Sequence, residues 1–178
     1  MTYLEPESIR DLLSRLEREW AEPRQTVHHG KPTALPLSVR FERADEPPAV
    51  SIAAPPDVME FWSLFKSARL FEDHRFSQWG LVLVPPERAQ VLTHQLRRDR
   101  ARDVLPGDLV IGEFLGDSDL LVVRTDREAA DYGSVLVVLP LDRRQDWFRV
   151  GASLTDFLRT YAAADGAKFW ETPRSAQA

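Results

Sequence analysis

The sequence of 178 residues contains no cysteine. This absence excludes disulfide bonds, thiolate catalysis and zinc sites built from cysteine. No apolar run approaches the ~20 residues that are needed to cross a bilayer, and the opening MTYLEPESIRDLL lacks the basic and apolar regions of a signal peptide. We therefore expect a cytoplasmic protein with no membrane partner.

The sequence also lacks the common catalytic and nucleotide-binding motifs. It has no G-x-S-x-G elbow, P-loop, G-x-G-x-x-G or H-E-x-x-H motif. Gly112-x-x-x-Gly116 lacks the Lys-Ser/Thr that would coordinate a nucleotide and its magnesium, so these glycines are predicted only to mark a turn. Asp117 and Asp119 begin like a calcium loop, whose later ligands are missing. We expect no enzyme activity, no bound metal and no cofactor.

Acidic side chains are concentrated in one part of the chain. The formal net charge of the whole sequence is −5. Segment 108–131 alone carries an excess of that size, because its seven carboxylates face only Arg124 and Arg127. These candidate partner-binding residues are Asp108, Glu113, Asp117, Asp119, Asp126, Glu128 and Asp131. A field of this sign repels nucleic acid and favours a basic partner, whereas the structural alternative is a solvated sheet edge and loop.

Apolar periodicity predicts four helices. A stripe of Ile9, Leu12, Leu13, Leu16 and Trp20 predicts the first, which Pro23 ends. Further helices are predicted to begin at 55–57, to cover 87–102 and to begin after 153. The last of them carries Ser and Asp in the spacing of an approximate capping box.

Short apolar or alternating runs predict strands at 37–41, 50–52, 79–84, 108–114, 119–124 and 135–139. The runs 108–114 and 119–124 are joined by a Gly-Asp turn, which is typical of a hairpin in the middle of a sheet. Residues 141–150 are expected to be extended and polar.

The order of these elements predicts an α+β fold: a central antiparallel sheet meander flanked by helices. Its 43% hydrophobic content suffices for a core, and its length fits one domain. We expect residues 1–54 to form an N-terminal helix and an irregular extension of that domain, 55–171 to form the α+β core, and 172–178 to be a frayed tail.

Several segments carry a family likeness. They are PPDVMEFWSLF from Pro55, WGLVLV from Trp79, LVIGEFLGDSDLLVV from Leu109, VLVVLP from Val135 and SLTDFLRTYAAA from Ser153. In this order the chain from about Pro55 to Glu171 resembles the SUKH superfamily, which joins bacterial immunity proteins to fungal cell-wall assembly regulators. The resemblance implies an α+β domain without catalytic residues, whose members typically bind and neutralise a partner toxin, often a nuclease or deaminase.

The first functional hypothesis is therefore an immunity protein that binds a basic toxin domain of a polymorphic or contact-dependent system through its acidic residues. The second is a regulatory scaffold of the same fold with several partners. The third is a carboxylate- or metal-dependent hydrolase that uses Asp117 and Asp119. The identity of the partner and the oligomeric state are left open by the sequence.

Overall fold

The computed structural model describes residues 7–171, so the predicted tail at 172–178 lies outside the described residues. Four α-helices are present: α1 (Ile9–Glu19), α2 (Pro56–Leu64), α3 (Pro86–Asp99) and α4 (Leu154–Ala163). The strands are β1 (Val27–His28), β2 (Lys31–Pro32), β3 (Leu37–Arg43), β4 (Phe65–Asp73), β5 (Leu81–Leu83), β6 (Asp108–Phe114), β7 (Leu120–Arg124), β8 (Val135–Val138) and β9 (Phe148–Gly151). Two short 3-10 helices, η1 (Arg144–Asp146) and η2 (Phe169–Glu171), complete the described chain.

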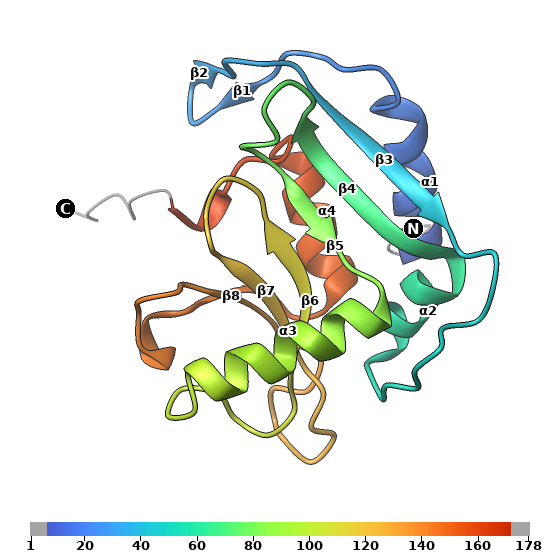
Figure 1. Cartoon of the computed structure of the whole chain (residues 1–178). Coiled ribbons are helices and arrows are strands. Elements are labelled where there is room, and N and C mark those ends of the chain that lie inside the picture. Colours follow the sequence, from blue (N-terminus) through green and yellow to red (C-terminus); the bar gives the residue numbers. More distant parts are fainter. Residues whose placement is uncertain (1–6, 172–178) are drawn as a thin grey trace, which may run out of the picture.

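Strands β3 to β9 form one seven-stranded sheet in sequence order, and every neighbouring pair is antiparallel. This arrangement confirms the predicted α+β meander. Helix α3 crosses one face of the sheet and packs mainly on β6, whereas α1, α2 and α4 contact one another on the other side (Figure 1). The remaining strands, β1 and β2, pair only with each other.

The helix ends follow the local sequence. In α1 the side chain of Ser8 accepts a hydrogen bond from the backbone N–H of Asp11, and in α4 Ser153 does the same for Asp156. The apolar stripe of α1 is buried as predicted. Buried side chains from α1 and β3 belong to the same hydrophobic core as those of the later elements, so residues before Pro55 contribute directly to that core.

Two local predictions were wrong, and a third was correct only in part. Residues 50–52 form no strand, and residues 65–73, where no strand was predicted, form the long strand β4. Helix α2 ends at Leu64 and the chain becomes extended at Phe65, where it pairs with β3 and β5. The polar segment 141–150 contains η1 and most of β9. Strands β4 and β9 form because they pair with neighbouring strands. Such pairing is not encoded in the local sequence pattern.

The turn between β6 and β7 fits tightly against the turn between β4 and β5. Gly116 has φ +87°, and a Cβ atom there would lie 2.0 Å from the carbonyl oxygen of Gln78. The adjacent Leu115 donates its backbone N–H to Gly80 O at 2.9 Å. Gly116 therefore serves two purposes, since it adopts a left-handed conformation and lets two backbones touch.

Candidate functional site

The predicted acidic residues do not form one surface. Antiparallel pairing places Asp108 opposite Arg124 at one end of the β6–β7 hairpin and Glu113 opposite Leu120 at the other end. A seven-residue strand separates these ends by roughly 20 Å. Asp126, Glu128 and Asp131 follow β7 and lie at the Asp108 end, whereas Asp117 and Asp119 lie at the hairpin tip.

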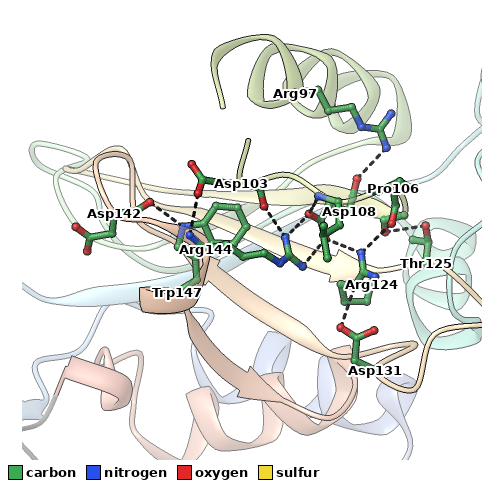
Figure 2. Close-up of polar contacts among 12 residues, drawn as sticks. Arg97, Asp103, Pro106, Asp108, Arg124, Thr125, Asp131, Asp142, Arg144 and Trp147 are labelled. Atoms are coloured by element: carbon green, nitrogen blue, oxygen red, sulfur yellow. Dashed lines mark hydrogen bonds and ion pairs between the residues drawn. The ribbon is translucent and has the colours of Figure 1, made fainter. Parts of the chain in front are cut away.

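At the Asp108 end, one buried carboxylate is held by two arginines (Figure 2). Asp108 is only 1% exposed. Its Oδ1 accepts hydrogen bonds from Arg124 Nη1 at 2.8 Å and Arg144 Nη2 at 3.2 Å, and its Oδ2 accepts from Arg144 Nη1 at 2.6 Å and Leu105 N at 2.7 Å. Both oxygens are therefore fully engaged by the protein itself.

The two arginines are tied to further groups. Arg124 donates Nε to Asp131 at 3.0 Å and Nη1 to Pro106 O at 3.0 Å, and Arg144 donates to Asp103 O at 3.0 Å (Figure 2). Burial by itself lowers the pKa of Arg124, but the hydrogen bonds to Asp108 and Asp131 outweigh burial, and the pKa lies above its ordinary value. With Asp131, this Asp108 cluster contains two carboxylates and two guanidinium groups and is electrically balanced.

Such a cluster fixes loops. It joins β6 to β7, to the turn that follows β7, and to η1, which lies 36 residues from Asp108. Asp126 caps the same turn by accepting the backbone N–H of Glu128 at 3.0 Å, and Glu128 itself is exposed. Asp108 is thus placed to stabilise the fold, and of the four acidic residues at this end Glu128 is the most available to a partner.

At the hairpin tip, one buried cation is surrounded by several carboxylates. The ammonium group of Lys168, only 6% exposed, forms ion pairs with Asp117, with Asp119 at 3.4 Å and with Glu171 at 3.7 Å. It also lies 5.3 Å from the ring centre of Phe114 and 5.8 Å from that of Trp79. This Lys168 cluster contains three carboxylates and one cation, so it carries excess negative charge.

The excess charge shifts the pKa values of Asp119 and Lys168. Burial raises the pKa of Asp119, and the neighbouring carboxylate of Asp117 raises it further. Burial alone lowers the pKa of Lys168, but the hydrogen bond and charge of Asp117, with Glu171 and Asp119, raise it above its ordinary value. The cluster therefore favours the charged form of Lys168 and disfavours the ionised form of Asp119.

A groove of about 480 Å³ opens beside this tip, between α3 and the ends of β6, β7 and β8. Its apolar lining consists of Leu92, Leu96, Phe114, Leu120 and Val138. Its charged lining consists of Asp99, Glu113, Asp117 and Asp119 against Arg100. We call this feature the acidic groove, and it collects three of the seven predicted residues in one place.

Sequence reasoning missed Asp99, Lys168 and Glu171. Asp99 lies between Arg98 and Arg100 at the end of α3 and belongs to no motif, although it lines the acidic groove. Lys168 is 49 residues from Asp119 along the chain, and no spacing rule connects the two. The one available signal was a lone lysine in an apolar segment beside Phe169, because lysine is rarely buried without a partner.

Comparisons with family models, curated proteins and solved structures found no match to this chain. Within residues 7–171, no helix is both long and apolar enough to span a membrane. In the same part of the chain, no three His, Asp or Glu side chains are grouped so as to hold a metal ion.

Proposed function

We propose that this protein is a non-catalytic binding domain whose acidic groove takes a basic segment of a partner protein. The groove itself carries the proposal, because it combines an apolar floor with four carboxylates on its lining. An apolar floor supplies the affinity of a protein contact, and charge of one sign on the rim speeds association with a partner of the opposite sign.

The carboxylates of the tip support binding better than hydrolysis. Lys168 bonds to Asp117 and Asp119 together, so its ammonium group takes the position between them that a metal ion or an acid–base pair would use. In contrast, within residues 7–171 Asp99 and Glu113 pair only with the exposed side chains of Arg98 and Arg88, respectively. Exposed pairs of this kind exchange partners at little cost, which suits a surface that meets a basic ligand.

The class of partner follows from the resemblance to the SUKH superfamily together with the acidic groove. We infer that the partner is a basic toxin domain, of nuclease or deaminase type, and that the protein neutralises it in the cytoplasm. A regulatory scaffold of the same fold is the second candidate, because one groove can serve several basic partners in turn. The number of partners separates these two candidates.

The test is co-expression of this protein with the C-terminal domain of the product of the gene immediately upstream of its own, followed by calorimetric titration of the two purified proteins. We expect protection of the cells and a one-to-one complex. The variant Asp99→Lys/Glu113→Lys reverses the groove rim without touching the Lys168 cluster, and it should weaken binding about tenfold or more and reduce its salt dependence.

The matched control is Asp126→Lys/Glu128→Lys, which changes the net charge equally at the opposite end of the hairpin. It should leave the affinity within about threefold, and thermal melting shows whether both variants remain folded. A larger loss in the control than in the groove variant would place the interface at the other end. Absence of both binding and protection would overturn the proposal.

A further inference from the structure

A pocket of about 450 Å³ lies beside α3 and shares no lining residue with the acidic groove. Helix α3 forms one wall and segment 51–53 forms another, while the start of β6 contributes Asp108 and Leu109. The other polar side chains of the lining are those of Ser51, Gln90, Thr93, His94, Arg97 and Thr125. A volume of this size with a few converging polar groups is typical of sites for small molecules. We call it the Arg97 pocket.

The side chain of Arg97 is held in position but has no counter-ion. It points from α3 toward β6, where its Nη2 donates to the backbone carbonyl oxygen of Asp108 at 3.2 Å (Figure 2). Among residues 7–171, no carboxylate forms an ion pair with Arg97. A single hydrogen bond leaves most N–H donors of a guanidinium group unused. The pocket therefore contains an oriented cation with donors to spare.

Asp108 supplies the carboxylate of the lining, but it does not neutralise Arg97. Its oxygens accept hydrogen bonds from Arg124 and Arg144, and the Asp108 cluster is balanced without Arg97. Asp126, in the turn that follows the lining residues of β7, already accepts a backbone N–H of its own turn at 3.0 Å. The positive charge of Arg97 is therefore left to the pocket.

Further donors without partners stand on both walls of the pocket. Gln90, His94 and Arg97 are spaced four and three residues apart on α3, so they share one face of the helix. Ser51 lies on the other wall, together with the backbone N–H groups of segment 51–53. Within the described residues 7–171, neither these N–H groups nor the side chains of Ser51, Gln90 and His94 form a hydrogen bond. The pocket thus offers donors from two directions around one cation.

Both walls are fixed to the body of the protein. The hydroxyl of Thr93 accepts the backbone N–H of Val110 at 2.9 Å, which joins α3 to β6. The carboxylate of Glu87 on α3 accepts the backbone N–H of Ala49 at 2.7 Å, which ties the segment before residue 51 to the same helix. Since the pocket is preformed, little ordering cost opposes a ligand.

We propose that the Arg97 pocket binds the phosphate group of a small phosphorylated molecule. The planar fork of a guanidinium group matches the oxygens of a carboxylate or a phosphate. A carboxylate has only the two oxygens that the fork occupies, whereas a phosphate monoester presents a third oxygen to the donors of the other wall. Ile52 and Leu109, the apolar side chains of the lining, contact the organic part of the molecule. The site is independent of the proposed function, because it differs from the acidic groove in place and in the charge of its ligand.

The probe is phenyl phosphate, compared with benzoate, which carries a carboxylate on the same ring. NMR titration of the isotope-labelled full chain follows binding at near-physiological salt in a phosphate-free buffer. Phenyl phosphate should bind saturably with a Kd of about 1 mM or tighter, and it should shift the Nε–Hε signal of Arg97 and the amide signals of residues 51–53. Inorganic phosphate should shift the same signals, and benzoate should bind at least about fivefold more weakly. No saturable shift, shifts confined to other residues, or equal affinity for benzoate would overturn the proposal.

Two variants locate the site. Arg97→Gln removes the charge and should weaken binding of phenyl phosphate about tenfold or more. Ala53→Trp fills the pocket from an exposed position and should weaken binding as much without touching Arg97. The control Arg18→Gln makes the same change at an exposed position of α1, on the other side of the sheet (Figure 1), and should stay within about twofold.

Thermal melting shows whether each variant is folded, and Ala53→Trp decides the matter if Arg97→Gln is not. Unchanged affinity in a folded pocket variant would overturn the proposal. Folded Arg97→Gln should bind the basic partner of the acidic groove normally, so failure of one proposal does not imply failure of the other.

Discussion

The two ends of the β6–β7 hairpin each bury one charged side chain among groups of opposite charge, but the sign of the buried charge differs between them. At the Asp108 cluster, a single buried aspartate is held by Arg124 and Arg144, and with Asp131 on Arg124 the charges balance. At the Lys168 cluster, a single buried lysine is surrounded by Asp117, Asp119 and Glu171, and negative charge remains. Each cluster borders a pocket, but the carboxylate of Asp108 on the first is satisfied by arginines, whereas unbalanced carboxylates of the second line the acidic groove.

The difference shows that an acidic stretch of sequence is not an acidic surface. Asp108 and Asp117 contribute equally to the net charge of segment 108–131. The charge of Asp108, however, is neutralised by Arg124 and Arg144, which the fold places beside it. Charge becomes available to a partner only where the fold supplies too few counter-ions. The three predictions below separate a carboxylate that stabilises the fold from one that charges the surface.

The largest effect is expected from Asp108→Asn. The amide keeps the shape of the side chain but leaves the guanidinium groups of Arg124, 4% exposed, and Arg144 without their shared counter-charge. Removing one partner of a buried ion pair costs on the order of 3–5 kcal/mol. Because Arg124 keeps its pairing with Asp131, we expect the lower end of that range, which is still a large part of the stability of a typical domain. Urea denaturation measures it, with Glu128→Gln as an exposed control from the same acidic segment. A loss no greater than that of the control would show that solvent reaches the arginines.

A smaller and pH-dependent effect is expected from Lys168→Met. Without the ammonium group, the carboxylates at the tip repel one another, and the loss should be about 2 kcal/mol near neutral pH because two of them reach solvent. The pKa of Asp119, already raised by burial and by Asp117, should rise further. The folded state then binds a proton more tightly than the unfolded chain does, so the deficit should shrink as the pH falls toward about 4.

Denaturation of this variant at several pH values measures the effect. The control is Lys66→Met, an exposed lysine that pairs with Glu42 and whose loss should leave stability nearly unchanged at every pH. A deficit that stays constant with pH would mean that lost packing, and not repulsion among the carboxylates, explains the loss.

Most of the fold could be predicted from the sequence because its signals are local. The stripe of α1, the serine cap of α4 and the Gly-Asp turn of the hairpin each specify their element within a few residues. Strand β4 could not be predicted in this way. Phe65 continues the apolar spacing of α2, and only its pairing with Arg43 on β3 shows that the helix has already ended.

The candidate site was predictable in composition but not in arrangement. The carboxylates of segment 108–131 are evident in the sequence, and the acidic groove does include three of them. Their partition depends on where Arg144 and Lys168 return to the hairpin, 36 and 49 residues away from the aspartates that they bind. Contacts at such separations are set by the packing of whole elements, which no motif records.

The smallest effect on stability is expected from Asp117→Asn, and it tests the comparison most directly. Asparagine can still accept the backbone N–H of residue 119, the hydrogen bond that Asp117 Oδ1 accepts at 3.0 Å, and Lys168 keeps its pairing with Asp119. Stability should therefore change by less than about 1 kcal/mol. The pKa of Asp119 should fall toward its ordinary value because a neighbouring negative charge has been removed.

NMR titration of the Asp119 carboxyl carbon in the wild type and in Asp117→Asn measures this shift, with Glu128→Gln as an exposed control beyond the opposite end of the hairpin. A pKa of Asp119 that stays in place, or rises, would mean that burial alone sets it and that the tip holds no excess charge. A fall in the pKa of Asp119 without a loss of stability would contrast with Asp108→Asn, for which removal of a carboxylate charge is expected to destabilise the fold. Charge at the Lys168 cluster could then be removed without harm to the fold, which is the property that a surface needs if its charge is to serve a partner.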